Sequence, residues 1–248
     1  MKPVLFLRSL LFYIGYFFAT MIISVLCMVV FWVLPLEKRF ALYSLWCRFV
    51  LFWLRVTCGV RYDIQGLDNI PDEPVVVLST HQSAWETIFL YYTLSPVCPI
   101  LKKELLDIPF WGWAVRLQQP IAIDRSKPRE AGRALLTQGK ERLQRGMSVV
   151  IFPEGTRSAP GTIKALNKGG AKHATTADAL ALPVIHNAGW CWPARTIYKY
   201  PGTITVRFGD PIVASGKSSA QLTEEYEAWL QENMAVITQD GRAQRTTE

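Results

Sequence analysis

Residues 75–87, VVVLSTHQSAWET, set the expected fold of this 248-residue chain. The apolar run at residues 75–78 follows Pro71 and Pro74 and is typical of a buried β-strand. A polar turn comes next, and a helix is expected to begin near Ser83. Reactive groups of α/β proteins lie at the carboxyl ends of strands, so this turn is the first candidate site.

His81 and Glu86 are the two side chains in this turn that could carry chemistry. On one continuous helix they would point about 140° apart, because each residue turns the helix by about 100°. If His81 lies in the turn and Glu86 in the first helical turn, the carboxylate can fix the imidazole tautomer and favour the imidazolium. Ser83-x-x-Glu86 is also a capping-box pattern, which would leave His81 a simple turn residue. Both interpretations stay open from this stretch alone.

Strands and helices are expected to alternate along the rest of the chain, which predicts an α/β fold with a mixed sheet flanked by helices. Further strands are predicted at residues 62–64, 97–101, 120–123, 147–152 and 182–185, with a hairpin-like pair at 197–200 and 203–208. Helices are predicted at residues 83–92, 128–145, 170–178 and 219–237, and a helical or loop segment at 103–118.

The N-terminal part of the chain is apolar enough to enter a membrane. No charge occurs from residue 9 to residue 36, and as a helix this run would extend about 42 Å, enough to span a bilayer with tilt. Residues 40–60 carry Arg48 and Arg55 on one helical face, which predicts an amphipathic helix in the headgroup region. The side chains expected to face the acyl chains are Trp46, Phe49 and Trp53.

Basic residues flank both ends of the first apolar run, so the positive-inside rule does not fix its orientation. A helix pair dipping into one leaflet explains this symmetry better than a single span. The predicted organisation is an N-terminal membrane-embedded helical pair over residues 1–60, an α/β domain over 61–238 and a flexible tail over 239–248.

Charge and cysteine usage exclude several classes of protein. The net charge is +7, and six of these positive charges lie in residues 1–61, which fits anionic phospholipid better than nucleic acid. The five cysteines are odd in number and form no C-x-x-C pair, so free thiols in a reducing compartment are expected. No His/Asp/Glu set has metal-ligand spacing, and no P-loop motif occurs. His173, beside Lys172, is expected to be solvated, whereas His186 at a strand end could lie near the site.

Two more predicted strands end in polar residues, Asp124-Arg125 and the turn at residues 153–157. Because strand ends of one sheet converge on one crevice, we expect these groups to lie near His81. In the second turn, Gly155 permits a positive φ or a close ligand approach, and Arg157 offers a fork suited to phosphate. The alternatives are a glycine turn with a solvated arginine, and an Arg125 paired with Asp124 at the surface.

The order of these motifs resembles the glycerolipid acyltransferase family, and within it the bacterial 1-acyl-sn-glycerol-3-phosphate acyltransferases. The resemblance covers roughly residues 60–215. It is carried by His81-x4-Glu86, Lys102-Lys103-Glu104-Leu105, Ile123-Asp124-Arg125 and Phe152-Pro153-Glu154-Gly155-Thr156-Arg157-Ser158. Two departures from the family pattern are a segment at residues 182–189 that is about three residues short and Gln119 in place of a glycine.

The resemblance implies roles for individual residues. His81 would be the general base and Glu86, where the family more often has Asp, its orienting carboxylate. The residues that would hold the acceptor phosphate are Arg125, Glu154, Gly155, Thr156 and Arg157, with Lys102 as a further candidate. No metal or cofactor is implied, and acyl-CoA or acyl carrier protein would supply the acyl group as co-substrate.

The implied activity is transfer of a fatty acyl group to the sn-2 hydroxyl of lysophosphatidic acid, which makes phosphatidic acid in phospholipid biosynthesis. The implied partners are a phospholipid bilayer, lysophosphatidic acid and the acyl carrier, and not nucleic acid. The implied location is the bacterial inner (cytoplasmic) membrane, with the catalytic domain on its cytoplasmic face. The alternatives are another acceptor, such as glycerol 3-phosphate or a lyso-aminolipid, and a non-catalytic lipid-binding protein of the membrane.

Overall fold

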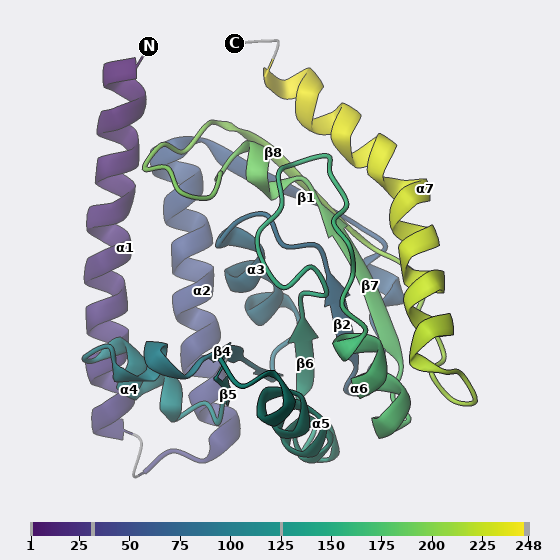
Figure 1. Cartoon of the computed structure of the whole chain (residues 1–248). Coiled ribbons are helices and arrows are strands. Elements are labelled where there is room, and N and C mark those ends of the chain that lie inside the picture. The colour runs from purple at the N-terminus through teal and green to yellow at the C-terminus, as the bar shows by residue number, and fades with distance from the viewer. Residues whose placement is uncertain (1, 31–32, 125, 246–248) are drawn as a thin grey trace.

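A mixed six-stranded sheet with the strand order β1-β8-β7-β2-β6-β3 forms the centre of the protein (Figure 1). The computed structural model describes residues 2–30, 33–124 and 126–245, with side chains described up to residue 239. The strands are β1 (Val60–Gln65), β2 (Val76–Ser79), β3 (Val97–Cys98), β6 (Ser148–Ile151), β7 (Ala181–His186) and β8 (Gly202–Phe208). β2 runs parallel to β6 and β7, whereas β7 and β8 are antiparallel. The predicted mixed sheet flanked by helices is confirmed.

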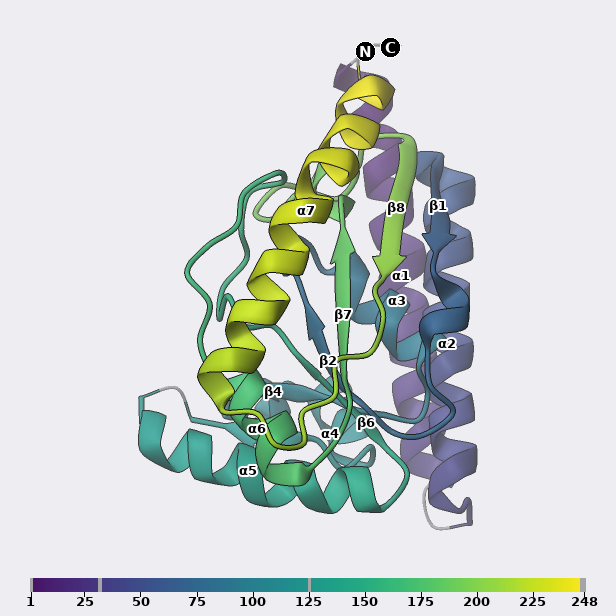
Figure 2. The same cartoon turned by 90° about the vertical axis from the view of Figure 1, so that its right-hand side faces the viewer.

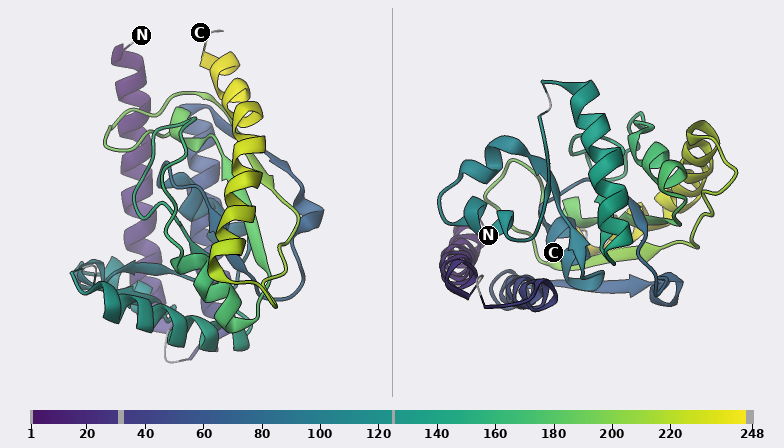
Figure 3. Two further views of the ribbon diagram at one scale, coloured as in Figure 1. Left: turned by 45° about the vertical axis from the view of Figure 1, so that its right-hand side comes forward. Right: turned by 90° about the horizontal axis from the view of Figure 1, so that it is seen from below.

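Alternation along the central strands divides the core between the two faces of the sheet. Val75 and Val77 pack into one cluster of buried residues, and Val76 and Leu78 into the other. A strand points successive side chains to opposite faces, so a continuous apolar run is what a strand covered on both sides requires. One face is covered by α2 (Leu36–Cys58) and α3 (Trp85–Thr93), the other by α6 (Gly169–Ala177) and α7 (Ser219–Arg245) (Figures 2 and 3).

A second, two-stranded sheet pairs β4 (Ile100–Lys102) with β5 (Ile121–Ile123) in parallel. The sequence predicted one strand at residues 97–101, but the chain breaks it into β3 and β4, which join different sheets. Between β4 and β5 lie η2 (Lys103–Asp107) and α4 (Trp111–Arg116), and α5 (Pro128–Gln144) follows β5. The strand that ends before Asp124 therefore does not belong to the central sheet.

The predicted hairpin at residues 197–208 is wrong. Only its second half forms a strand, β8, which pairs in parallel with β1 and antiparallel with β7. Lys199 in the first half makes contacts that a hairpin strand could not make. Its backbone N–H donates to Ser9 Oγ at 2.9 Å, and its ammonium group donates to the hydroxyl of Tyr13 at 2.8 Å. Both partners lie on the N-terminal helix, so tertiary contacts decide this segment.

Helix α7 is longer than the sequence predicted. It runs from Ser219 to Arg245, beyond the expected end at residue 237 and into the segment expected to be a flexible tail. The predicted start at residue 219 is confirmed.

The first two helices, α1 (Lys2–Val30) and α2, lie side by side (Figure 1, and Figure 3, right). By length and composition both could cross a membrane. α1 exposes many large apolar side chains, whereas α2 buries one face against the domain. Trp46 was expected to face acyl chains, but it is buried and donates to Thr20 Oγ1 at 3.1 Å, so this expectation is wrong. Phe49, three residues further along α2, is 39% exposed.

Candidate active site

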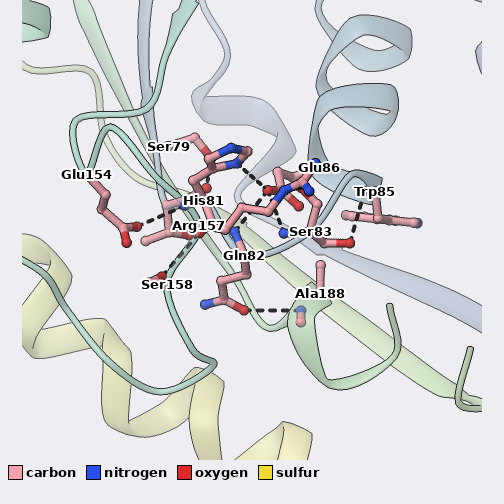
Figure 4. Close-up of polar contacts among 12 residues, drawn as sticks. Ser79, His81, Gln82, Ser83, Trp85, Glu86, Glu154, Arg157, Ser158 and Ala188 are labelled. Atoms are coloured by element: carbon pink, nitrogen blue, oxygen red, sulfur yellow. Dashed lines mark hydrogen bonds and ion pairs between the residues drawn. The ribbon is translucent and has the colours of Figure 1, made fainter. Parts of the chain in front are cut away.

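The turn between β2 and α3, residues 80–84, brings the imidazole of His81 against the carboxylate of Glu86 (Figure 4). His81 Nδ1 and Glu86 Oε1 are 2.7 Å apart. The Glu86 side chain is 1% exposed, whereas the His81 side chain is 19% exposed. His81 lies in the turn and Glu86 in the first turn of α3, so the contact expected for that arrangement is confirmed. Because Nδ1 faces the carboxylate, Nε2 is the ring nitrogen that can meet a substrate proton.

Glu86 also closes the beginning of α3. Its Oε1 atom accepts the backbone N–H of Gln82 at 2.9 Å and that of Ser83 at 2.8 Å. The Ser83 hydroxyl in turn accepts the N–H of Trp85 at 3.1 Å. The bond from the Ser83 amide to Glu86 is the half of a capping box that the glutamate supplies. The two interpretations of residues 81–86 therefore hold together: one carboxylate caps the helix and faces the histidine.

The carboxylate of Glu86 is stabilised in its charged form although it is buried. Burial alone would raise the pKa of this carboxyl, but the His186 ring, the hydrogen bond with His81 and the Ser83 amide outweigh it and lower the pKa below its ordinary value. A carboxylate that accepts several N–H bonds is stabilised in its ionised form. Glu86 is thus poised to stabilise an imidazolium on His81.

His186 lies on the buried side of Glu86, at the carboxyl end of β7. Its Nε2 atom is 3.9 Å from Glu86 Oε2 and donates to the Thr80 carbonyl oxygen at 2.9 Å. Its Nδ1 accepts the Ala188 N–H at 3.3 Å. Both ring nitrogens therefore have partners, and burial lowers the pKa of His186, a shift that the nearby Glu86 carboxylate partly opposes. The expectation that this strand-end histidine lies near the site is confirmed.

The turn that follows β6, residues 152–158, also contacts His81. The Phe152 ring stacks on the imidazole with ring centroids 4.2 Å apart. The His81 N–H donates to Glu154 Oε1 at 2.9 Å, and its carbonyl oxygen accepts the Ser158 N–H at 2.7 Å. Since β2 and β6 are parallel neighbours, their carboxyl ends bring these two turns together as predicted.

Glu154 faces the protein in this arrangement. It is 7% exposed, and burial raises the pKa of its carboxyl. A carboxylate repels a phosphate, whereas its contact with the His81 amide fixes the turn that carries the histidine. In this structure the Glu154 carboxylate supports the backbone of the turn that carries His81.

The exposed part of the same turn is cationic. Arg157 donates through Nε to the Ser83 carbonyl oxygen at 3.0 Å, which leaves the end of its guanidinium group at the surface. Gly155 has a φ of +69°, a conformation that favours glycine. Lys164, which the sequence did not single out, donates to Thr156 Oγ1 at 3.2 Å and to the Arg157 carbonyl oxygen at 2.7 Å. Only the folded chain brings Lys164 here, because the motif itself ends at Ser158.

Lys102 belongs to the other, smaller sheet. Lys102 is exposed at the end of β4 and pairs in register with Ile123 of β5. Arg125 lies outside the described residues. Asp124 accepts the backbone N–H of Ser126 at 2.9 Å and its hydroxyl at 2.6 Å. The expectation that all three polar strand ends lie on one sheet is corrected: two do, and the third follows β5.

The remaining histidine differs from expectation. His173 on α6 is fully buried against Gly139 of α5, and neither ring nitrogen has a hydrogen-bond partner. Burial lowers its pKa to about 4, so the ring is neutral. The prediction of a solvated His173 is wrong because α5 covers this face of α6. In the part of the chain that the structure describes, no group of three or more His, Cys, Asp or Glu side chains could hold a metal.

The fold and the site define a class of α/β protein in which a histidine–glutamate pair follows the carboxyl end of a central strand. The sequence matches the acyltransferase family over residues 61–187, and the chain belongs to this family.

Three similar proteins illustrate the match. The chain is 43% identical to the 1-acyl-sn-glycerol-3-phosphate acyltransferase of Pseudomonas aeruginosa, over 96% of this chain and 94% of that protein. It is 30% identical to the 1-acyl-sn-glycerol-3-phosphate acyltransferase alpha of Homo sapiens, over 56% of this chain and 50% of that protein. The crystal structure of the 1-acyl-sn-glycerophosphate (LPA) acyltransferase PlsC from Thermotoga maritima superposes with a TM-score of 0.78 at 23% identity, covering 92% of this chain and 94% of that one. This last match shows a shared fold.

Proposed function

We propose that this protein transfers a fatty acyl group from an acyl thioester to the sn-2 hydroxyl of 1-acyl-sn-glycerol-3-phosphate, forming phosphatidic acid. The observation that carries the proposal is the contact between His81 Nδ1 and Glu86 Oε1 beside the exposed guanidinium of Arg157. A relative named for this activity matches nearly the whole chain. The same reaction requires a base for an alcohol and a cation for a phosphate.

His81 acts as the general base in this mechanism. Its Nε2 atom takes the proton of the acceptor hydroxyl as the oxygen attacks the thioester carbonyl carbon. The resulting tetrahedral intermediate collapses as the carbon–sulfur bond breaks, and the proton on His81 passes to the leaving thiolate. Glu86 stabilises the imidazolium that exists between these two steps. General-base catalysis of this kind contributes roughly 10²- to 10⁴-fold to the rate.

No acyl-enzyme intermediate enters the mechanism. All five cysteines are buried, and the sequence has no G-x-S-x-G nucleophile elbow. The acceptor hydroxyl therefore attacks the thioester directly.

The acceptor phosphate binds to the turn after β6. Arg157 offers its guanidinium fork, and Thr156 and the turn's backbone amides add hydrogen-bond donors. Lys102 adds positive charge from the end of the two-stranded sheet, and Arg125 is proposed as a second cation. Glu154 holds the His81 backbone while these groups hold the ligand.

The two N-terminal helices anchor the domain in a bilayer, where the acceptor's own acyl chain resides. The exposed apolar side chains of α1 support this placement. We assign the protein to the bacterial inner membrane with the catalytic domain on the cytoplasmic face, where acyl-CoA and acyl carrier protein are available as donors.

An acceptor and donor panel tests the function. Purified protein in detergent is offered lysophosphatidic acid, glycerol 3-phosphate or a lyso-aminolipid, each with acyl-CoA or acyl carrier protein, and acylated product is measured by mass spectrometry. His81→Ala protein sets the background. The proposal expects phosphatidic acid as the dominant product, made only by the unmodified chain. Acylation of a different acceptor would replace the substrate, and lysophosphatidate binding without thiol release would favour the lipid-binding alternative.

A further inference from the structure

A basic groove is lined by residues of α2, β1 and α3, and no residue of the β2 and β6 turns lines it. α2 and β1 lie side by side in Figure 2. Its volume is about 510 Å³. The residues that line it are Arg48, Leu51, Phe52, Arg55, Arg61, Tyr62 and Tyr92. The side chains thus come from α2, from β1 and from the end of α3. This set is called the arginine groove below.

The three positive charges of the arginine groove are not neutralised by the protein. In the described part of the chain, none of Arg48, Arg55 and Arg61 forms an ion pair, and Asp63 on the same strand does not reach them. The guanidinium groups lie close enough to Tyr62 to act on its phenol. Burial raises the pKa of Tyr62, and Arg55 and Arg48 partly oppose this shift. Three like charges around one hollow repel each other, so an anion placed there would be favoured.

An apolar stripe runs along α2 directly beside the groove. Leu45, Phe49, Phe52 and Val56 are 59%, 39%, 59% and 56% exposed and follow one another at helical spacing. Phe52 belongs both to this stripe and to the groove. Such a helix presents cations at headgroup level and an apolar face to acyl chains.

We propose that the arginine groove binds the phosphate of an anionic phospholipid from the bilayer, with the lipid's acyl chains against the apolar stripe of α2. This site is separate from the acceptor site at Arg157 and does not depend on the reaction proposed above. Charge complementarity and the neighbouring apolar surface together select a lipid over a soluble anion.

Tyr62, which lines the groove, also packs against α3, the helix that carries Glu86. The Tyr62 ring packs on Trp85 with centroids 5.9 Å apart and on Phe89 at 5.3 Å. Trp85 is the first residue of α3, the helix that carries Glu86. A lipid held in the groove therefore ties this helix to the membrane surface.

Native mass spectrometry of the full chain in mild detergent tests the proposal. The protein is titrated with phosphatidylglycerol or with phosphatidylcholine of the same acyl chains, and the apparent Kd of each lipid is read from the bound states. The groove variant is R48Q/R55Q/R61Q. The matched control is R129Q/R133Q/K172Q, which removes three charges from another surface hollow, lined by α5 and α6. Thermal unfolding shows whether each variant is folded.

We expect the unmodified chain and the control to prefer phosphatidylglycerol by at least about tenfold, since each basic side chain near an anionic lipid surface strengthens binding several-fold. The groove variant should lose this preference. An equal loss in both variants would indicate general attraction and overturn the proposal, as would a preference that survives in the groove variant. Displacement of the lipid by inorganic phosphate would assign the groove to a free anion and also contradict the proposal.

R48K/R55K/R61K keeps the charge but not the guanidinium fork. If the groove clamps a phosphate through its forks, this variant should lose a large part of the preference despite its unchanged net charge. Full retention of the preference would reduce the arginine groove to a diffuse charged surface and contradict a defined site.

Discussion

The two ends of the candidate site are built in different ways. Around His81, the turns after β2 and β6 are tied to each other by Glu154 and Ser158, and Glu86 ties His81 to the start of α3. The strands that precede these turns are buried neighbours in one sheet. Lys102 instead lies at the exposed end of a separate two-stranded sheet. Its side chain makes no hydrogen bond or ion pair in the described part of the chain. Several contacts hold the His81 region in place, whereas the backbone alone holds the Lys102 region. These two are called the rigid region and the Lys102 region below.

The difference matches the role proposed for each group. A general base must stand within hydrogen-bond reach of one proton, so small displacements cost much of its effect. A cation that attracts a phosphate acts over a longer distance and tolerates movement. The rigid region should therefore respond sharply to substitution and the Lys102 region mildly.

Replacing His81 with Ala gives the largest expected effect. Loss of the base should lower kcat for acyl transfer by about 10³-fold. The fold should survive, since Glu154 bonds to the backbone of residue 81 and not to its side chain. Steady-state kinetics and thermal unfolding in detergent measure both. Retained turnover in a folded His81→Ala protein would remove His81 from the mechanism.

Acid should weaken the support beneath the rigid region. His173 lies on α6, which packs through Gly170 on Leu78 of β2 and Ile151 of β6. Its pKa is lowered from 6.5 to about 4, so the unfolded chain takes up a proton that the folded chain resists. The contribution of the neutral His173 ring to the free energy of unfolding should be fully present above pH 6.5. It should be lost as the pH drops toward 4, by about 3 kcal/mol at most.

Chemical unfolding at several pH values tests this, with His173→Leu as the matched variant. The variant lacks the titrating ring, so its unfolding midpoint should depend less on pH between 6.5 and 4. The same pH dependence in both proteins would assign the acid sensitivity elsewhere.

Arg157→Ala removes the guanidinium group that is proposed to bind the acceptor phosphate together with Lys102. Loss of a charge-assisted bond costs about 1.5–3 kcal/mol, which corresponds to a rise in KM for lysophosphatidic acid of roughly 10- to 100-fold. The effect should largely vanish with monoacylglycerol, an acceptor without the phosphate. An equal loss with both acceptors would mean that Arg157 serves mainly to hold Ser83, its backbone partner at 3.0 Å.

Lys102→Gln should have the smallest effect. An exposed cation that meets its partner across solvent contributes at most about 1 kcal/mol, so KM should rise only severalfold. The effect should also shrink as salt is added. Lys140→Gln, on the exposed face of α5, controls for net charge. A loss in Lys102→Gln as large as that in Arg157→Ala would contradict the division into a rigid and a tolerant region.

The rigid region could be predicted from the sequence because its decisive contacts are local. His81 and Glu86 are five residues apart, and the apolar runs before both turns identify buried strands. The meeting of the β2 and β6 turns follows from a general property of parallel sheets. The glutamate's half of the capping box and the contact with His81 are both present, and both use Glu86 Oε1.

The rest depends on contacts between distant segments, which residue patterns do not encode. Pro99 interrupts the predicted strand at residues 97–101, but the sequence does not show that the two parts join different sheets. The positions of Lys199 and His173 are set by Ser9 of α1 and by Gly139 of α5, each far away in the chain. The expectation that the strand before Asp124 belongs to the central sheet was wrong for the same reason, since β5 pairs with β4 rather than with the central strands.

A double-mutant cycle on the 2.7 Å contact between His81 and Glu86 tests the central claim most directly. kcat is measured for the unmodified chain, His81→Ala, Glu86→Gln and the double variant with lysophosphatidic acid and an acyl thioester. If Glu86 acts through His81, Glu86→Gln should lower kcat strongly in the unmodified chain and have almost no further effect in the His81→Ala background. Two losses that multiply in the double variant would contradict a base and its orienting carboxylate working as one unit.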